Sequence, residues 1–317
     1  MSRPLVSVLL VVRNGASVIK RCLETIEAQR WRPLELIIID GDSDDDTVNW
    51  IKDNISNYDI PIRIVSNPNK TLASGWNLGI QSAKGDYLIR PDGHSELDPL
   101  AIENGVKKLE INPAWSAVGA VLNTKSKGLV AGWIATVLSN PVGVGGSRFR
   151  IGVKKDKETD TAVYALYRRE VFEKTGRFNE GMKRNQDIEF HKRAQDLGYR
   201  FFTSPDVQAT YYSRSSANQF LKQAFSNGYW VTRDSGGHLR HLAPLVFVVG
   251  MSGISLFNLP LAGLVLSAYL TICLMSYLLI SRVWNPLVWS ALLILTLGLH
   301  ISYGLGSLWG CIRRIVG

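Results

Sequence analysis

Short apolar runs alternate with longer mixed stretches over the first 90 residues of the chain. The apolar runs occupy residues 6–12, 34–39, 62–65 and 87–89. They are rich in β-branched and aliphatic side chains, as expected for strands that are buried on both faces of a parallel sheet. The stretches between them, residues 17–29, 47–55 and 73–83, have the spacing or composition of helices. This alternation predicts a doubly wound α/β sheet.

The middle of the chain is less regular. We expect helices over residues 99–109 and 187–197, and strands over residues 160–167 and 199–203. A glycine-rich loop is expected over residues 139–150. No GxGxxG motif follows the first strand, which disfavours a dinucleotide-binding enzyme.

The character of the sequence changes after Arg240. Three apolar runs follow, over residues 242–257, 261–280 and 286–301, and no Asp or Glu occurs from Leu242 to the last residue. About 20 apolar residues cross a bilayer, so the second run is near spanning length, and the first is short enough to be tilted or re-entrant. Buried core helices are disfavoured, because three such runs share no acidic residue. We therefore expect a soluble domain over residues 1–240 and a membrane region over residues 241–317, with two to three transmembrane helices.

The positions of charged residues indicate how the membrane region is oriented. At the N-terminus, the apolar run over residues 6–12 is interrupted by Arg13 and Asn14, so it is not a signal peptide. The N-terminal domain should therefore stay in the cytosol. Arg282 fits a return to the cytosol after two crossings. A third crossing would place Arg313 and Arg314 outside, against the positive-inside tendency. The last run therefore either breaks that tendency or folds back, with its tail in the interface on the cytosolic surface.

The net charge of +9 indicates partners that are anionic. Nucleic acid is disfavoured, because the chain has no zinc-ligand spacing, RNP-like aromatic motif or arginine-rich arm. Sugar nucleotides, lipid phosphates and anionic membrane surfaces remain. The three cysteines form no CxxC pair, which indicates buried thiols in place of a disulfide framework or metal cluster.

Two acidic features follow strands at the edge of the predicted sheet where ligands bind. Asp40 ends the second strand, and its carboxylate suits the hydroxyl and N–H donors of a nucleoside. The acidic residues that follow it are better explained as caps of the next helix. Asp92 follows the fourth strand, and with His94 it could hold a divalent cation, Mn²⁺ or Mg²⁺, on a diphosphate. An exposed turn is the alternative for the second feature.

Two further features lie later in the chain. Asp187, at the expected start of a helix, could take a proton from an acceptor hydroxyl, although a helix cap is the alternative. Tyr229 and Trp230 could stack on a sugar ring, and the alternative is a position at the membrane interface.

The order of these motifs resembles the inverting family 2 glycosyltransferases of the GT-A fold. The later motifs resemble the branch typified by succinoglycan-biosynthesis glucosyltransferases of the ExoA type. The resemblance covers nearly the whole chain. The residues that carry it are the Asp40 to Thr47 segment, Asn77-Leu78-Gly79-Ile80, Gly85-Asp86, Asp92-Gly93-His94, Arg184 to Glu189, Pro205, Arg214-Ser215-Ser216, Gln223, Gly228-Tyr229-Trp230 and His300 to Gly306.

The resemblance implies a role for each matching position. Asp40, Asp42, Asn77 and Asp92 would bind the nucleotide sugar, Asp92 and His94 would hold the metal, and Asp187 would be the catalytic base. Gln223, Tyr229 and Trp230 would lie on the acceptor side. Three departures from the family pattern are Val11 in place of Pro, His94 in place of the last Asp of DxD, and the missing Arg of the Q-x-x-R-W motif. The last departure weakens any expectation of processive polymer synthesis.

We therefore expect a membrane-associated inverting glycosyltransferase that moves a sugar, from a UDP-sugar by resemblance, to a hydroxyl of a lipid-linked sugar. Transfer to a polyprenyl phosphate is one alternative, although an anionic acceptor needs no base. A catalytically silent membrane-tethered binding protein of the same fold is another. A transporter is disfavoured by the small number of spanning segments.

Overall fold

The computed structural model describes residues 3–93, 95–235 and 239–316. The chain forms two compact units. Unit 1 comprises Met1–Asn123 and Gly152–Tyr211, and unit 2 comprises Thr124–Ile151 and Tyr212–Gly317. Unit 2 therefore takes in a segment from the middle of the chain, whereas the sequence predicts a single division near residue 240. The division into a catalytic domain up to residue 240 and a membrane region after it stays a prediction.

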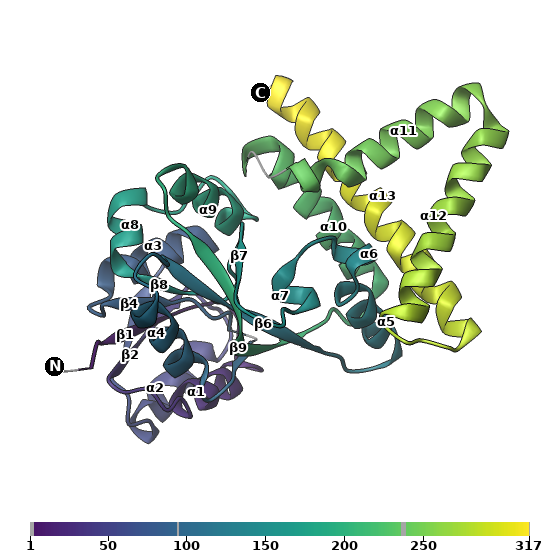
Figure 1. The fold of residues 1–317 in the computed structure, drawn as a ribbon. Coiled ribbons are helices and arrows are strands. Elements are labelled where there is room, and N and C mark those ends of the chain that lie inside the picture. The colour runs from purple at the N-terminus through teal and green to yellow at the C-terminus, as the bar shows by residue number, and fades with distance from the viewer. Residues whose placement is uncertain (1–2, 94, 236–238, 317) are drawn as a thin grey trace. The chain divides into compact units, whose positions relative to one another are not determined.

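Unit 1 is built on a mixed sheet with the strand order β3-β2-β1-β4-β8-β6-β9-β5 (Figure 1). The first half is parallel: β1 (Val6–Val12) lies between β2 (Leu34–Asp40) and β4 (Tyr87–Ile89), and β3 (Ile62–Ser66) pairs with β2. The second half is antiparallel. Its strands are β5 (Glu96–Leu97), β6 (Ala117–Lys125), β7 (Lys157–Thr159), β8 (Leu166–Arg168) and β9 (Phe201–Tyr212). The predicted doubly wound α/β fold is confirmed.

The helices of unit 1 are short and bury one side each against the sheet. They are α1 (Ile19–Glu27), α2 (Thr47–Asn54), α3 (Leu72–Ser82), α4 (Ala101–Ile111), α8 (Arg169–Thr175) and α9 (Gln186–Asp196), with a 3₁₀ turn at Ile55–Asn57. One core cluster joins alternate strand residues such as Leu9 and Ile37 to Trp76, Phe172 and Phe190 from three helices. Side chains alternate across a strand, so the neighbouring positions face the opposite side.

The expected strand over residues 160–167 is wrong for most of its length. Strand β8 begins only at Leu166, because Tyr164 adopts a left-handed backbone conformation (φ 46°) that breaks an extended run. Strand β6 was not predicted, and β9 is longer than expected, with Pro205 inside it. Both belong to the antiparallel half, where partly exposed strands mix polar and apolar residues and give a weaker signal.

Unit 2 is helical within the described residues. Its elements are α5 (Leu129–Leu138), α6 (Pro141–Val144), α7 (Arg148–Ile151), α10 (Ala217–Trp230), α11 (Ala243–Phe257), α12 (Leu259–Leu279) and α13 (Pro286–Val316), with a π-helical turn at Val231–Ser235 and a 3₁₀ turn at Leu239–Leu242. The expected glycine-rich loop therefore contains two short helices, α6 and α7. Helix α5 was missed, and α13 extends 15 residues beyond the expected end of the last apolar run.

Three helical segments of unit 2 are long and apolar enough to cross a membrane, by length and composition. They are Leu239–Phe257, Leu259–Leu279 and Pro286–Val316. Large apolar side chains on them are exposed, including Phe257 at 91% and Leu287 at 83%. Such a surface is typical of a protein that associates with a membrane.

Candidate active site

Asp40 ends strand β2 and is almost fully buried, with 8% of its surface exposed. Its carboxylate accepts hydrogen bonds from the Ser43 backbone N–H at 3.1 Å and from the Ser43 hydroxyl at 2.6 Å. These bonds turn the chain sharply after the strand. A carboxylate has about four lone-pair positions, so Asp40 can still accept from a ligand.

The loops after β1 and β2 are fastened to each other. Asn14 donates its backbone N–H to the Ser43 hydroxyl at 2.9 Å, and its side-chain oxygen accepts from the Asp44 N–H at 3.0 Å. Gly15 donates to the Thr47 hydroxyl at 2.8 Å. Asp45 accepts from Ala16 and from the first residue of α2, whereas Asp46, the N-cap residue of α2, makes no side-chain cap bond. The site edge is therefore preorganised around Asp40.

Asp92 lies on the other side of β1 from Asp40. Val12 pairs with Asp40 and Val11 forms a bridge with Asp92, so the two carboxylates flank the end of one strand. Neighbouring strands lie about 4.8 Å apart, which places the two backbones roughly 10 Å from each other. The Tyr164 hydroxyl donates to Oδ2 of Asp92 at 3.1 Å, and the Asp92 carbonyl accepts from Ser95. The two predicted strand-end aspartates are thus brought to one edge.

Arg90 is a buried cation that sequence reasoning missed. It is 5% exposed, and its guanidinium carbon lies 4.1 Å from the Trp76 ring centroid and 4.5 Å from that of Phe178. Arg90 Nη2 donates to the Tyr167 hydroxyl at 3.0 Å, and that oxygen lies 2.8 Å from His191 Nε2. One sequence signal could have indicated this role: Arg90 directly follows a buried apolar strand and precedes Pro91. A charged side chain at such a position is buried, and a buried cation needs partners.

Asp187 lies in the first turn of α9. The N-cap residue of this helix, Asn185, adopts a left-handed backbone conformation (φ 58°). Its Oδ1 accepts from the Ile188 backbone N–H at 3.0 Å. Burial raises the pKa of Asp187, the Arg90 charge opposes this rise, and the Asp92 charge adds to it. A carboxyl group whose pKa is raised toward neutrality is a better general base than an ordinary one. Asp92, Arg90 and Asp187 therefore form one electrostatic group.

Asn77 and Asp42 have other partners in the structure. The Asn77 side chain is 3% exposed, donates to the Phe178 carbonyl at 3.0 Å and to Glu180 at 2.8 Å, and accepts from the Phe178 N–H at 2.9 Å. It holds the 178–180 loop, and its nucleotide role stays a prediction. Asp42 is exposed and ion-paired with Lys70, whose hydrogen bond and charge lower the pKa of the Asp42 carboxyl.

The predicted acceptor-side residues all lie in α10, within unit 2. Gln223 Oε1 accepts from Arg214 at 3.2 Å. The Tyr229 and Trp230 rings meet edge to face with centroids 5.3 Å apart, and Arg233 lies over both, 5.6 and 5.3 Å from their centroids. Arg233 also donates to the Tyr229 hydroxyl at 3.0 Å. A guanidinium thus joins this aromatic pair from the next turn, although the family's Arg is missing from the motif itself.

The residues present fit a divalent cation that is shared with a diphosphate. His94, the second predicted ligand, lies outside the described residues. Among residues 3–93, 95–235 and 239–316, no three His, Cys, Asp or Glu side chains are grouped closely enough to hold a metal alone. Mg²⁺ and Mn²⁺ bound with nucleotide phosphates commonly use only one or two carboxylates. The hydrogen bond from Tyr164 leaves lone pairs on Asp92 for that purpose.

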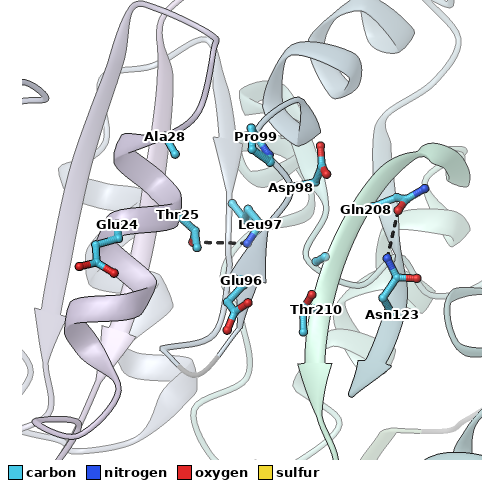
Figure 2. A pocket seen from close by; sticks show the side chains of 11 residues that line it. Glu24, Thr25, Ala28, Glu96, Leu97, Asp98, Pro99, Asn123, Gln208 and Thr210 are labelled. Carbon is cyan, nitrogen blue, oxygen red and sulfur yellow. Dashed lines mark hydrogen bonds between the residues drawn. The ribbon is translucent and has the colours of Figure 1, made fainter. Parts of the chain in front are cut away.

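A separate pocket of about 310 Å³ lies beside α1, lined by residues of α1, the 96–99 segment, β6 and β9 (Figure 2). Thr25 Oγ1 accepts from the Leu97 N–H across it, and Asn123 donates to Gln208 at 3.0 Å (Figure 2). None of the predicted site residues lines this pocket. The candidate active site is therefore the strand-end edge with Asp40, Asp92 and Asp187.

Comparison with known proteins shows the family to which the chain belongs. A family model described as Glycosyl transferase family 2 matches residues 7–176. A Methanococcus voltae protein, the dolichyl N-acetyl-alpha-D-glucosaminyl phosphate 3-beta-D-2,3-diacetamido-2,3-dideoxy-beta-D-glucuronosyltransferase, is 27% identical over 231 residues, which cover 70% of this chain and 71% of that protein. The succinoglycan biosynthesis protein ExoA of Rhizobium meliloti is 27% identical over 241 residues, 73% of this chain and 72% of ExoA.

Solved structures share the fold. The mannosyltransferase PcManGT from Pyrobaculum calidifontis, in complex with GDP-Man and Mn²⁺, matches with a TM-score of 0.67 and 18% identity, covering 97% of this chain and 88% of that one. GalNAc-T7 with UDP, GalNAc and Mn²⁺ matches with a TM-score of 0.54 and 16% identity, covering 72% and 48%. The expected GT-A fold is confirmed.

Proposed function

Because the chain belongs to glycosyl transferase family 2, we propose that this glycosyltransferase moves a sugar from a nucleoside-diphosphate donor to a hydroxyl of a lipid-linked sugar. The anomeric configuration inverts in a single displacement. The observation that carries the proposal is the electrostatic grouping of Asp187 with Asp92 and Arg90 at the strand-end edge of unit 1. This arrangement pairs a base of raised pKa with a carboxylate placed for a diphosphate.

Three carboxylates, Asp40, Asp92 and Asp187, each have a defined part in the proposed reaction. Asp40 accepts hydrogen bonds from the nucleoside, and its fastened loop keeps the carboxylate in place. Asp92 would hold a divalent cation, which would supply positive charge against that of the departing diphosphate. Asp187 removes the acceptor proton while the acceptor oxygen bonds to the anomeric carbon and the bond to the diphosphate breaks. The nucleophile enters opposite the leaving group, which inverts the centre.

The identity of the acceptor rests on two supports. A phosphate acceptor is already anionic and needs no base, so a carboxylate with a raised pKa at position 187 favours a hydroxyl. The Methanococcus relative is named for transfer to a dolichyl-linked N-acetylglucosaminyl phosphate. The ExoA relative is named for succinoglycan biosynthesis. A lipid-linked sugar in polysaccharide or glycan synthesis is consistent with both.

The donor and the cellular location are part of the same proposal. The donor is a UDP-sugar, and the divalent cation is Mn²⁺ or Mg²⁺, supported by the Mn²⁺ in two proteins of the same fold. In this proposal the chain lies in the cytoplasmic membrane with its catalytic unit in the cytosol. The exposed apolar helices of unit 2 support the membrane association. Tyr229 and Trp230 contact the acceptor in this proposal.

The decisive experiment is a screen of UDP-, GDP- and dTDP-sugars with full-length protein, reading release of the nucleoside diphosphate in the presence of membrane extract. Asp187→Asn should lose at least a hundredfold in transfer while its donor affinity changes little. Full transfer by that variant would refute the assigned base.

The cation role is tested separately. Asp92→Asn should require a higher Mn²⁺ or Mg²⁺ concentration for half-maximal donor binding. Asp44→Asn, which changes an exposed carboxylate of the neighbouring loop, is the matched control and should not. Donor binding that is unaffected by chelation would remove Asp92 from this role.

A further inference from the structure

Helix α13 packs along α10 for about half of its length. A Cβ placed on Gly306 would meet the Phe225 carbonyl, and one on Gly310 would meet that of Tyr229. Near the start of the contact, Gly298 lies against Leu221. The order of these contacts means that the two helices run in the same direction. Small residues allow this close approach, as in Gly-x-x-x-Gly helix pairs.

Helix α10 cannot be a membrane span. It has 14 residues and is therefore roughly 21 Å long, against a hydrocarbon core of about 30 Å. It also carries Asn218, Gln219 and Lys222 on its exposed surface. Only four residues separate it from the end of β9, so it stays on the side of the membrane where the catalytic unit lies.

The beginning of α13 is held on the same side. Asn140 caps α6, in the segment that enters and leaves unit 2 from the catalytic unit. Its amide donates to the Ser281 hydroxyl at 2.9 Å and to the Ser276 carbonyl at 3.3 Å, and its oxygen accepts from the Ser276 hydroxyl at 2.8 Å. These bonds fix the end of α12, and α13 begins five residues after Ser281.

The free side of α13 is an apolar stripe. Its exposed residues recur at intervals of three, four and seven, which places them on one helix face. They are Leu287, Ile294, Ile301, Leu305, Leu308, Ile312 and Ile315. The basic residues Arg313 and Arg314 end the helix, and the Arg313 guanidinium lies 4.9 Å from the Trp309 ring centroid. An apolar face with Trp and Arg beside it is typical of helices in the membrane interface.

The distribution of charge points to the kind of membrane surface. Unit 2 carries eleven Lys and Arg residues and one acidic residue, Asp234, whereas unit 1 carries 25 basic and 26 acidic residues. The whole positive excess of the chain therefore belongs to unit 2. If α13 crossed the bilayer, Arg313 and Arg314 would leave the other basic residues and lie on the far side, against the positive-inside rule.

We propose that α13 lies in the plane of the membrane interface, with its apolar stripe (Leu287 to Ile315) in the leaflet and Arg313 and Arg314 on anionic phospholipid headgroups. The C-terminus then stays on the side of the catalytic unit. Only the hairpin of α11 and α12 enters the bilayer core. This inference rests on membrane association and not on the catalytic assignments, so its tests use no activity readout.

The first test determines sidedness with full-length protein in sealed vesicles of known orientation. A Cys311→Ser background receives either Val316→Cys, at a 76% exposed position, or Lys52→Cys, on the surface of the catalytic unit. Cys22 and Cys273 are buried in the folded protein. A membrane-impermeant maleimide should label both engineered thiols in the same vesicle orientation. Labelling in opposite orientations would show that α13 spans and overturn the proposal.

The second test measures depth along the stripe. A fluorophore is attached to Ile294→Cys, Ile301→Cys or Leu308→Cys in the same background and quenched by lipids brominated at defined chain positions. These positions span 14 residues, or about 21 Å of helix. A helix in the interface gives similar depths at all three, whereas a spanning helix gives depths that differ by most of that length. Labels shielded from every lipid by a second copy of the chain would also overturn the proposal.

The third test addresses the lipid charge. With the label at Leu308→Cys, quenching should be stronger in vesicles of mixed phosphatidylcholine and phosphatidylglycerol than in phosphatidylcholine alone. Adding Arg313→Gln and Arg314→Gln should remove most of that difference. Equal quenching in both lipids with the native arginines would refute the headgroup contact.

Discussion

The guanidinium carbon of Arg90 lies 4.1 Å from the centroid of the Trp76 ring. The rings of Phe178 and Tyr167 complete the surroundings of this cation, and the charge of Arg90 reaches Asp187. Aromatic faces stabilise a cation without neutralising it. The charge of Arg90 therefore acts on the proposed base and favours the ionised carboxylate that proton removal needs.

Arg90→Met should shift the low-pH limb of the pH–rate profile to higher pH. The Arg90 charge lowers the pKa of Asp187, so its loss lets burial raise that pKa further. Less of the base is then ionised at neutral pH, and the rate falls there. The measurement is kcat against pH, with Arg90→Lys as the control that keeps the charge. An unchanged midpoint in Arg90→Met would mean that Arg90 does not act on Asp187.

Asn77→Ala should destabilise the catalytic unit without a matching loss of donor affinity. The substitution removes three hydrogen bonds to Phe178 and Glu180 and leaves the buried Phe178 N–H without its acceptor. We expect a loss of roughly 2–3 kcal/mol in unfolding free energy. Denaturation and donor titration distinguish this from a nucleotide contact. Glu180→Gln keeps an oxygen acceptor for Asn77 and should change the stability by less than about 1 kcal/mol.

The residues show which parts of the fold a sequence can reveal. Strand β1 was predicted with its observed bounds, because a strand buried on both faces leaves an uninterrupted apolar run. Strands β6 and β9 mix exposed and buried positions, and their pairing joins residues far apart in the chain. No local pattern encodes such a pairing. The left-handed backbone of Tyr164 could not be predicted from sequence either, because such conformations are expected at glycine and this residue is a tyrosine.

Some residues of the candidate site could be placed from sequence, and others could not. Asp40 and Asp92 could be placed together from sequence, because strand ends of a parallel sheet share one edge. The group of Arg90, Tyr167 and His191 could not, because those residues are 77 and 24 positions apart and meet only through tertiary packing. The sequence predicts a ligand contact for the asparagine of the Asn77-Leu78-Gly79 motif, and this contact stays a prediction. The hydrogen bonds of Asn77 to the backbone and side chain of a distant loop could not be predicted from the motif.

Gly306→Ala should destabilise the membrane unit, whereas Gly263→Ala should not. A methyl group at Gly306 would overlap the Phe225 carbonyl of α10, and backbone cannot move aside easily. Overpacking of this kind costs about 1–3 kcal/mol. Nothing lies within 4 Å of a Cβ at Gly263, in the second turn of α12, and Ala is the better helix former there. Thermal midpoints of the two variants in detergent should therefore differ, and equal midpoints would argue against the contact of α10 with α13.

Asp187→Asn should raise thermal stability above acidic pH while it removes transfer. Burial raises the pKa of Asp187 in the folded protein above its unfolded value. The native state therefore binds the proton more tightly, and its stability falls as the pH rises through these pKa values. Asparagine has no charge to desolvate, so the variant avoids this loss. At a pH low enough to protonate the carboxyl in both states, the two proteins should melt alike.

The comparison is a pair of melting curves at acidic and neutral pH, with Asp44→Asn as the exposed control that should show no such difference. Saturating divalent cation with a nucleoside diphosphate should reduce the advantage of Asp187→Asn, because positive charge beside Asp92 offsets the repulsion that Asp187 feels. A variant that melts below the native protein at neutral pH would mean that the Asp187 carboxylate stabilises the fold. In that case the strain expected of a partly buried catalytic base would be absent, and the proposed role of Asp187 would lose its main physical support.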